Sequence, residues 1–452
     1  MINPLIFREY DVRGTVGTDL TPSTVEAIGR GFGTYAIGKG VRTVTVGRDC
    51  RLSSPAFRDA LVAGLAATGL DVIDVGICPT PLLYFSIVTL AADGGVMITG
   101  SHNPPEFNGF KLCIGPSTLY GAKIQEIRRL IETAAFASGR GTVSSRDIAG
   151  RYMDYVRSII SIPRKLKVVV DAGNGTASRI APDLFRALGM EVVELFCEMD
   201  GRFPNHFPDP TVPENLRFLV EAVRETGADL GVAYDGDADR IGAVDERGTV
   251  LYGDYLLALF AREILSRKPG ATIISEVKAS QNLYDDIARH GGRPVMWKAG
   301  HSLIKQKMKD EGAEAAGEMS GHIFFADRYL GFDDAIYASA RLFEIVARSD
   351  RPLSAMLADM PPVVATPEIR VDCPDDLKFA VVGRVASLVS SQAREVIDVD
   401  GVRAVFDGGW GLVRASNTQP VLVLRFEGRD EATVRRIRSV MEEAVRKARA
   451  EA

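Results

Sequence analysis

A serine on a sharp chain corner is the first candidate for covalent chemistry in this sequence. Residues 99–111 read TGSHNPPEFNGFK, and the apolar run before them predicts a buried strand that leads into a turn. Gly100 and the two prolines fix the backbone around Ser101 and prevent a helix from continuing. His102 and Lys111 could supply a proton carrier and a cation beside the hydroxyl, as an activated nucleophile requires. We therefore expect Ser101 to react, with an ordinary turn serine as the alternative.

A second block, residues 235–240 (DGDADR), could bind a hard divalent cation. Its three carboxylates stand at alternate positions with only small residues between them, so they can converge on one ion. The spacing also fits an EF-hand loop, but Arg240 stands where that loop needs glycine, and both flanks predict strands. An acidic, solvated turn is the other alternative, although carboxylates this close repel each other when no cation lies among them. The block predicts a magnesium site with open positions for water or phosphate oxygens.

Two further polar blocks could hold an oxygen-rich ligand. In residues 317–322 (GEMSGH), Glu318 and Ser320 alternate, so in an extended loop both would face a sugar; a glycine-bracketed turn is the alternative. Residues 414–420 (RASNTQP) combine an arginine fork with hydroxyl and amide donors, a set that matches the oxygens of a phosphate monoester. An ordinary polar loop is the alternative for this block.

The composition is that of a globular protein with several cores. The chain has 452 residues, 46% of them hydrophobic and 25% charged, which is enough for roughly three or four domains. A net charge of −5 without a long basic block argues against nucleic acid or an anionic membrane as a partner. The five cysteines form no Cys-x-x-Cys pair, and no eighteen apolar residues run together. We expect a cytoplasmic protein without a disulfide framework or a zinc site.

One pattern of elements occurs three times and must position these blocks. A strand, a polar turn, a helix and a second strand are predicted in residues 41–76, 167–195 and 271–296, with helices at about 54–68, 178–188 and 280–290. This alternation predicts mixed or parallel sheets covered by helices, and the repetition indicates three related domains. Residues 171–176 resemble a phosphate cradle but lack the Lys-Ser/Thr pair of a P-loop, so we interpret them as a turn.

The pattern changes in the last part of the chain. Polar or proline-rich stretches near residues 138–150, 246–253 and 360–368 predict domain boundaries. Beyond them we expect strands at 368–372, 396–412 and 421–427, with helices at about 376–390 and from 430 onward. The expected fold class is α/β, with three topologically related α/β domains and a smaller C-terminal α+β domain. The four domains are expected at residues 1–147 (serine loop), 148–249 (acidic block), 250–363 (third block) and 364–452 (fourth block).

Together the four blocks resemble the α-D-phosphohexomutase superfamily, most closely its phosphomannomutase/phosphoglucomutase branch, over essentially the whole chain. The resemblance implies four domains around a central cleft. It implies reversible phosphoryl transfer between the 1- and 6-positions of mannose and glucose phosphates, through a phosphoserine enzyme and a 1,6-bisphosphate. It also implies Mg²⁺ as cofactor and glucose 1,6-bisphosphate or mannose 1,6-bisphosphate as activator.

The resemblance also implies roles for individual residues. Ser101 matches the phosphoserine of the family. Ser101, Asp235, Asp237 and Asp239 match its metal ligands. Six residues are implied in catalysis: Ser101, Arg13, His102, Lys111, Arg240 and His301. Which of Lys111, His102 and His301 transfers the proton is left open. Eight residues are implied in substrate binding: Lys278, Glu318, Ser320, His322, Arg414, Ser416, Asn417 and Thr418. Arg414, Ser416, Asn417 and Thr418 belong to a loop that binds the phosphate. His206 and His290 belong to no motif and receive no role.

The choice of substrate stays open at this point. Glu318-Met319-Ser320 resembles the loop that accepts both glucose and mannose phosphates, whereas the glucosamine branch usually has Gln in place of Met319. The family commonly has Gly where Ala238 stands. The alternatives are a phosphoglucosamine mutase, a metal-dependent sugar-phosphate phosphatase and an inactive scaffold; the intact motifs argue against the scaffold. We expect hexose phosphates as partners, no nucleic acid or membrane, a monomer rather than a homodimer, and closure of the fourth domain on substrate.

Overall fold

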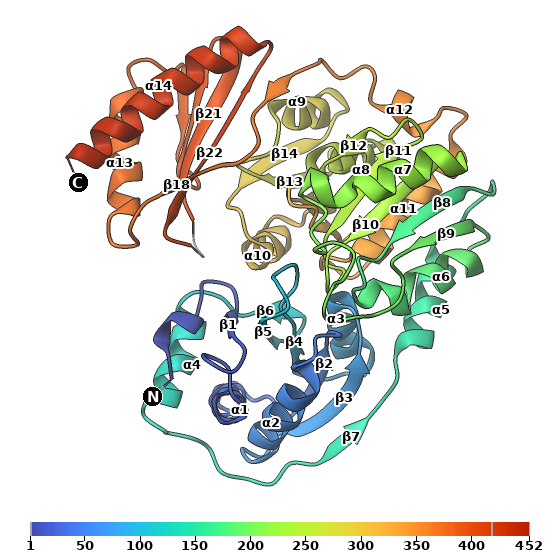
Figure 1. The fold of residues 1–452 in the computed structure, drawn as a ribbon, viewed down its shortest axis with the longest axis vertical. Helices are drawn as coiled ribbons and strands as arrows, with labels where there is room; N and C mark the ends of the chain where they lie inside the picture. The colour runs from blue at the N-terminus through green and yellow to red at the C-terminus, as the bar shows by residue number, and fades with distance from the viewer. Residues whose placement is uncertain (1, 417–418, 452) are drawn as a thin grey trace.

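Four sheets with helices packed on them follow one another along the chain. The computed structural model describes residues 2–416 and 419–451. The chain runs as an arc from the blue N-terminal part, through the green and yellow middle, to the red C-terminal part (Figure 1). We number the sheets one to four in chain order. No helix among the described residues has the length and apolar character needed to cross a bilayer.

The first sheet is mixed and carries the serine loop between β4 and β5. Its order is β1-β5-β4-β2-β3-β7, with β6 paired to β5. Strands β4, β2, β3 and β7 are parallel, whereas β5 is antiparallel to both β4 and β1. Strand β7 lies in a stretch predicted as a linker; its side chains are exposed and give no strand signal. The elements are η1 (Pro4–Ile6), β1 (Val12–Thr15), α1 (Pro22–Gly38), β2 (Thr43–Arg48), α2 (Ser54–Ala66), β3 (Asp71–Ile77), α3 (Thr80–Thr89), β4 (Gly94–Ile98), β5 (Phe107–Ile114), β6 (Ser117–Thr118), α4 (Ala122–Glu132) and β7 (Val143–Ser145).

The second sheet presents the acidic block on a hairpin turn. Its order is β12-β11-β10-β8-β9, and β10 and β11 are antiparallel neighbours with residues 235–240 between them. The helix predicted at 178–188 is a 3-10 turn followed by a shorter α-helix, because Pro182 fits only the first turn of a helix. The elements are α5 (Ala149–Ile159), β8 (Lys167–Asp171), η2 (Thr176–Arg179), α6 (Ala181–Ala187), β9 (Glu191–Leu195), η3 (Pro213–Leu216), α7 (Arg217–Thr226), β10 (Leu230–Tyr234), β11 (Ile241–Asp245) and β12 (Val250–Leu251).

The third sheet repeats the same unit. Its order is β14-β13-β15-β16, and only β16 is antiparallel to its neighbour. The predicted repeats are confirmed as β2-α2-β3, β8-α6-β9 and β13-α9-β14, each closed by two parallel strands. The elements are α8 (Gly253–Arg267), β13 (Thr272–Glu276), α9 (Gln281–Arg289), β14 (Arg293–Trp297), α10 (His301–Glu311), β15 (Ala315–Gly317), β16 (Ile323–Phe325), α11 (Ala335–Arg348) and α12 (Leu353–Met356).

The fourth sheet is antiparallel, as expected for a change to an α+β pattern. Its order is β17-β22-β21-β20-β19, with β18 paired to β22. Apolar side chains of α13 and α14 cover the sheet and form a core of their own. The elements are β17 (Val364–Ala365), β18 (Ile369–Asp372), α13 (Lys378–Val389), β19 (Glu395–Ile397), β20 (Val402–Phe406), β21 (Gly409–Ala415), β22 (Val421–Gly428) and α14 (Glu431–Ala450).

The first three sheets are fused through a shared core. One cluster of buried apolar side chains contains Leu82 of α3, Val168 of β8 and Leu257 of α8, which belong to three different sheets or their helices. The fourth sheet's cluster contains none of these elements. The serine loop, the acidic block and the third block are therefore carried by a continuous body, to which the fourth sheet is attached.

Candidate functional site

The serine loop and the acidic block touch each other. Ser101 Oγ donates a hydrogen bond to Asp235 Oδ2 at 2.7 Å and lies 3.2 Å from His102 Nδ1. The Ser101 backbone is in the left-handed region, with φ +49°, which is strained for a residue with a side chain, and its N–H donates to Thr99 Oγ1 at 2.8 Å. A Cβ at Gly236 would lie 2.5 Å from the Ser101 carbonyl oxygen. Glycine at 236 thus permits the contact between the two loops.

The three carboxylates of the acidic block form one buried cluster. Asp235, Asp237 and Asp239 are each 0% exposed, and they offer oxygen atoms that lie within 4.8 Å of one another. Oδ1 of Asp237 and Oδ1 of Asp239 have no hydrogen-bond partner among the described residues. Thr80, at the N-terminus of α3, donates its hydroxyl to Asp237 Oδ2 at 2.5 Å. Orphaned carboxylate oxygens in a dry cluster fit a divalent cation, and a solvated turn is excluded by the burial.

Lys111 supplies the positive charge nearest to the acidic cluster. Its Nζ donates to Asp237 Oδ2 at 2.8 Å and also contacts Asp239 Oδ2. Burial opposes the charge on Lys111, but the two aspartates raise the pKa of its ammonium above the ordinary value. Burial opposes the charge on Asp237 too, yet Lys111 holds the pKa of that carboxyl below its ordinary value. Burial and the neighbouring carboxylates raise the pKa of Asp235. Lys111 is therefore a cation here.

Two of the predicted proton carriers are neutral imidazoles. Burial, followed by the charge of Arg240, lowers the pKa of His102 well below its ordinary value. Burial and Lys305 do the same to His301, whose ring stacks on that of His322 with centroids 5.5 Å apart. A neutral imidazole has a lone pair that can accept a proton near neutral pH. His102 and His301 thus differ from Lys111 in charge state.

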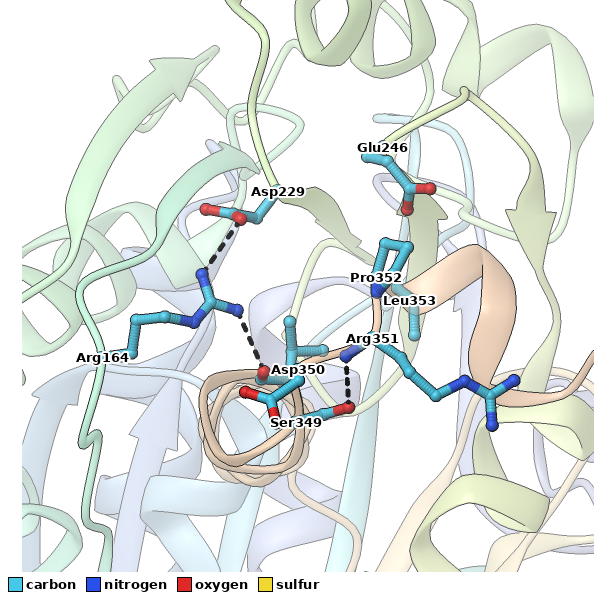
Figure 2. A pocket seen from close by; sticks show the side chains of 9 residues that line it. Arg164, Asp229, Glu246, Ser349, Asp350, Arg351, Pro352 and Leu353 are labelled. Atoms are coloured by element: carbon cyan, nitrogen blue, oxygen red, sulfur yellow. Dashed lines mark hydrogen bonds and ion pairs between the residues drawn. The ribbon is translucent and has the colours of Figure 1, made fainter.

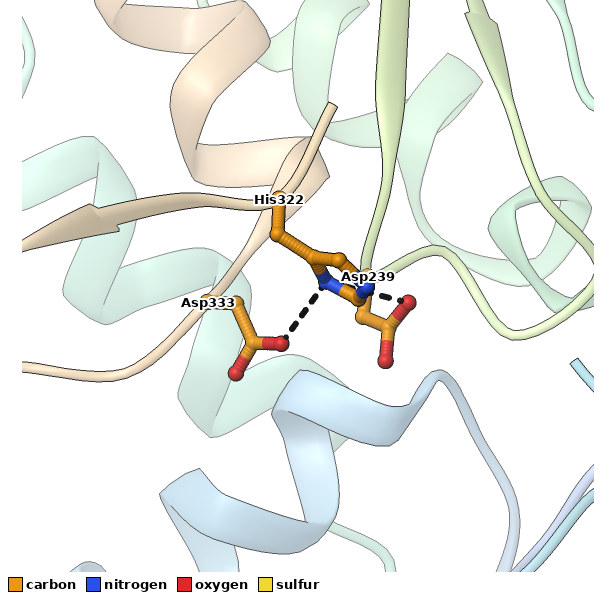
Figure 3. A group of neighbouring side chains, drawn as sticks. All are labelled: Asp239, His322 and Asp333. Atoms are coloured by element: carbon orange, nitrogen blue, oxygen red, sulfur yellow. Dashed lines mark ion pairs between the residues drawn. The ribbon is translucent and has the colours of Figure 1, made fainter. Parts of the chain in front are cut away.

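His322 lies beside the carboxylates of Asp239 and Asp333 (Figure 3), and Arg240 contacts its ring as well. Arg240 Nε donates to His322 Nε2 at 3.0 Å, so the other ring nitrogen, Nδ1, carries the proton. That N–H faces Asp333 Oδ2 at 2.9 Å, with Asp239 Oδ1 3.6 Å away. Lys305 Nζ reaches the other oxygen of Asp333 at 3.1 Å. The Nδ1 nitrogen of His322 carries a proton in this arrangement, so it has no lone pair to offer a metal ion.

The third block is a tight turn, which is the glycine-bracketed alternative to an extended loop. The Gly321 N–H donates to the carbonyl of Glu318 at 2.9 Å, which closes the turn. Glu318 is 4% exposed, and its carboxylate accepts from the Gly300 N–H at 2.8 Å. Ser320 stays half-buried in the turn. The glycines that bracket the block favour the turn over an extended strand.

Two predicted cations are held by acidic neighbours. Arg13, on β1, pairs with Asp11 at 2.6 Å, and its charge contributes to the low pKa of His102. Lys278, in the turn after β13, pairs with Glu368 at 2.8 Å. Arg13 is thereby placed on the serine side of the site, and Lys278 at the junction of the third and fourth sheets.

The fourth block is joined to the third sheet through one carboxylate. Arg414 Nε donates to Asp400 Oδ2 at 3.0 Å, and the Ala299 N–H donates to the same oxygen at 3.0 Å. Ser416, directly after β21, accepts from the Gln419 N–H at 3.2 Å. Two predicted residues of this block, Asn417 and Thr418, lie outside the described residues.

Some supporting residues carry no signal in the sequence. The turn at 171–176 supports the acidic block, because the Thr176 N–H donates to the Gly236 carbonyl at 3.0 Å. Thr80, Lys305 and Asp333 reach the site from positions without a motif around them. A local pattern cannot reveal them, since each meets its partner only in the folded chain.

A separate cavity of about 360 Å³ contains none of the predicted site residues (Figure 2). We call each sheet together with its helices a sheet unit. The cavity lies where the second and third sheet units meet, and Arg164 in its wall pairs with Asp229 at 3.4 Å. Arginine and carboxylate side chains are mixed in its wall, so its charges offset one another. The residues that line it are Arg164, Asp229, Glu246, Val346, Ser349, Asp350, Arg351, Pro352 and Leu353.

Four family models match consecutive parts of the chain. All four describe phosphoglucomutase/phosphomannomutase: alpha/beta/alpha domain I matches residues 4–138, domain II residues 150–248, domain III residues 252–364 and the C-terminal domain residues 368–444. Each matched segment contains most strands of one of the four sheets and one of the four polar blocks.

Whole-chain relatives agree with the family models. A phosphomannomutase/phosphoglucomutase of Pseudomonas aeruginosa is 49% identical over 96% of this chain and 94% of its own length. A phosphoglucomutase of Neisseria gonorrhoeae is 45% identical over 96% of this chain and 95% of its own length. The crystal structure of a phosphoglucomutase/phosphomannomutase family protein from Burkholderia thailandensis superposes with a TM-score of 0.94 at 44% identity and covers 99% of this chain and 98% of that one. This chain is an enzyme of the phosphoglucomutase/phosphomannomutase family, within the α-D-phosphohexomutase superfamily.

Proposed function

We propose that this enzyme moves a phosphoryl group reversibly between O1 and O6 of mannose and glucose phosphates, through phosphorylated Ser101 and a 1,6-bisphosphate. The hydrogen bond of 2.7 Å from Ser101 Oγ to Asp235, at the edge of a buried carboxylate cluster, carries this proposal. It places a nucleophilic oxygen where a metal and several cations can neutralise a phosphoryl group. The names of the Pseudomonas and Neisseria relatives support the choice of hexose phosphates.

The charged residues divide the work of phosphoryl transfer. Mg²⁺, held by Asp235, Asp237, Asp239 and an oxygen of the phosphorylated Ser101, would neutralise the transferring group. In the first half-reaction the sugar O6 attacks the phosphorus on Ser101, so that a P–O6 bond forms and the P–Oγ bond breaks. Arg240, Arg13 and Lys111 would stabilise the charge on the phosphoryl oxygens.

The proton balance follows from the charge states. The O6 proton passes to a neutral imidazole, His301 or His102, because an uncharged ring can accept it. The serine oxygen takes a proton from the Lys111 ammonium, which the aspartates keep charged. The second half-reaction runs these transfers in reverse on O1 of the bisphosphate. Ser101 then carries a phosphoryl group again, and the sugar leaves as the 6-phosphate.

The two ends of the substrate need different partners. Lys278, Glu318, Ser320 and His322 would contact the sugar from the third sheet, while the loop with Arg414, Ser416, Asn417 and Thr418 would hold the phosphate that is not transferred. A grip separate from the reacting serine lets either end be held while the other reacts. We further propose that the enzyme works as a monomer in the cytoplasm, which size-exclusion chromatography and cell fractionation would test.

An activity assay with matched serine variants tests this function. Purified enzyme with Mg²⁺ and a trace of glucose 1,6-bisphosphate should convert mannose 1-phosphate and glucose 1-phosphate to their 6-phosphates. Ser101→Ala should abolish both conversions and keep the fold, whereas Ser390→Ala, at an exposed position after α13, should behave as the unmodified enzyme. Conversion of glucosamine 1-phosphate alone would indicate a phosphoglucosamine mutase, and net release of phosphate would indicate a phosphatase.

Removal of the metal tests the acidic cluster. Excess EDTA should stop the transfer, and added Mg²⁺ should restore it, because Lys111 alone would then offset three buried carboxylates and the charge of the transferring phosphoryl group. Full activity in EDTA would show that the cluster works without a metal.

A further inference from the structure

Arg51 is a fully buried arginine directly behind the serine loop. It stands between β2 and α2, and its side chain is 0% exposed. A guanidinium has five N–H hydrogens, and each has an acceptor here. Nε donates to Asp49 Oδ2 at 3.1 Å, and the two Nη atoms donate to the carbonyl oxygens of Ser101 (2.8 Å), Asn103 (2.6 Å), Pro104 (2.6 Å) and Phe107 (3.0 Å).

Three of these carbonyls belong to the loop that presents Ser101, and the fourth, that of Phe107, stands where the loop enters β5. Carbonyl groups in a loop have no neighbouring strand to accept hydrogen bonds from. Here a single guanidinium donates a hydrogen bond to each of them. Asp49 completes the arrangement, because its Oδ2 also accepts from the Gly100 N–H at 3.1 Å. The loop is therefore held on both sides of Ser101, whose left-handed backbone needs support from its surroundings.

Close packing leaves the guanidinium no other position. A Cβ at Gly100 would lie 2.5 Å from Arg51 Cζ, and one at Gly201, in the second sheet unit, would lie 2.6 Å from Arg51 Cα. The ring of Phe203, from the same segment as Gly201, lies 5.1 Å from the Arg51 Cζ and adds a cation–π contact. Arg51 thus fixes the serine loop against the unit that also carries Asp235.

We propose that Arg51 is a positioning residue for phosphoryl transfer. Its fork holds residues 101–107 in the conformation that presents Ser101 Oγ to Asp235. It does so through the loop's carbonyls, since none of its five hydrogen bonds goes to Oγ. The inference rests on the proposed function, in which Ser101 carries the phosphoryl group. A displacement of about 1 Å at a reacting atom can lower a rate by on the order of a hundredfold.

Substitution by lysine separates positioning from general stability. Arg51→Lys keeps the charge but loses the planar fork, so most of the four carbonyl bonds are lost. We expect kcat for glucose 1-phosphate to fall by on the order of a hundredfold, with KM unchanged, because the predicted sugar and phosphate loops are untouched. The matched control is Arg341→Lys, another arginine with a 0% exposed side chain, which pairs with Glu263 and Asp327 of the third sheet unit. It should keep kcat and KM, whatever its effect on melting temperature.

The outcomes distinguish this inference from the proposed function. The positioning role would be overturned if Arg51→Lys had the same kcat as Arg341→Lys. It would also be overturned if kcat/KM of Arg51→Lys fell because KM rose. Ser101→Ala is assayed alongside, and only its retained activity would overturn the proposed function itself. If Arg51→Lys yields no folded protein, Gly100→Ala takes its place, because the added methyl group displaces the guanidinium from the other side. That variant should lose kcat at unchanged KM, and an unchanged kcat would refute the inference.

Discussion

Single methyl groups decide the spacing between the nucleophile and the acidic cluster. At Gly236 a side chain would press on the Ser101 backbone, whereas Ala238, two residues further, already has a side chain and a left-handed φ of +57°. The acidic block therefore contains one position where glycine is required and one where alanine is tolerated at the cost of some strain.

Gly236→Ala should uncouple the two loops. The added Cβ meets a backbone oxygen at 2.5 Å, which cannot move aside as a flexible side chain would. We expect kcat to fall by about a hundredfold, because the carboxylates shift relative to Ser101. Steady-state kinetics on glucose 1-phosphate measure this. Ala238→Gly is the matched control; it relieves strain at the left-handed position and should stay within about threefold of the unmodified kcat. Equal activity of both variants would refute the steric argument.

The local motifs predicted much of the candidate site. Ser101, the three aspartates and Lys111 were found because their types and spacing form short patterns, and the structure brings them together. Thr80, Asp333 and Arg51 were missed, since their partners are distant in the sequence and their own neighbours are ordinary. The roles assigned to the predicted residues remain to be tested by the variants described above.

At the scale of elements, one carboxyl joins three parts of the middle of the molecule. Asp334 caps α11 by accepting from the Tyr337 N–H at 2.9 Å. It also accepts the hydroxyls of Tyr152, on α5, at 2.8 Å and of Tyr329 at 2.5 Å. Burial raises the pKa of Asp334 to about 6, although these hydrogen bonds lower it. The carboxyl thus titrates in a range where most carboxyls are already charged.

The pH dependence of stability should reveal this carboxyl. The pKa of Asp334 in the folded state lies above its unfolded value of 3.8. Its stabilising contribution to the free energy of unfolding is therefore complete below about pH 4 and is lost as the pH rises through about 6. We predict that the free energy of unfolding of the unmodified protein, minus that of Asp334→Asn, falls by up to about 3 kcal/mol between pH 4 and pH 7. Urea titrations at several pH values give this difference. A flat or rising difference would contradict the buried, raised carboxyl.

The sequence predicted elements best where periodicity was long. The three βαβ copies were found because each has short strands rich in Val and Ile on either side of a helix, at a similar spacing along the chain. Strands β7, β12 and β17 are two or three residues long, and such pieces become strands only through their neighbours in a sheet. For residues 318–321 the sequence left an extended loop and a glycine-bracketed turn open, because alternation of polar residues does not distinguish a strand from a turn with glycines at its ends.

At the scale of the whole molecule, the fourth sheet unit is the separable part. The first three units share one core cluster, the first unit has a second cluster of its own, and the fourth unit has its own cluster, with a small cluster of Val277, Trp410 and Leu412 between the third and fourth units. Arg403, 0% exposed on β20, connects them: its Nη1 donates to the carbonyls of Val277 at 2.6 Å and Ala279 at 2.8 Å, and its Cζ lies 3.8 Å from the Trp410 ring centroid. These two carbonyls belong to the residues on either side of Lys278. The contact with the fourth unit therefore also fixes the backbone position of Lys278.

Loosening this contact should split thermal unfolding into two steps. Arg403→Lys loses the bonds to both carbonyls, which weakens docking by about 1–3 kcal/mol. Calorimetry should show the fourth unit unfolding at a lower temperature, with the main transition in place. Arg436→Lys is the control, because Arg436 is exposed and, among the described residues, donates to the carbonyl of Asp407 within the fourth unit. A common shift of a single transition would show that all four units unfold together.

The hydrogen bond between Ser101 and Asp235 joins residues 134 positions apart. A ribosome adds about 5–20 residues per second, so roughly 7–27 seconds pass between the synthesis of the serine and that of the aspartate. During this interval the nascent chain contains Ser101 but none of the three carboxylates. On the proposed function, activity can therefore begin only after the second sheet has been synthesised, because a shorter chain has Ser101 without its carboxylate partners.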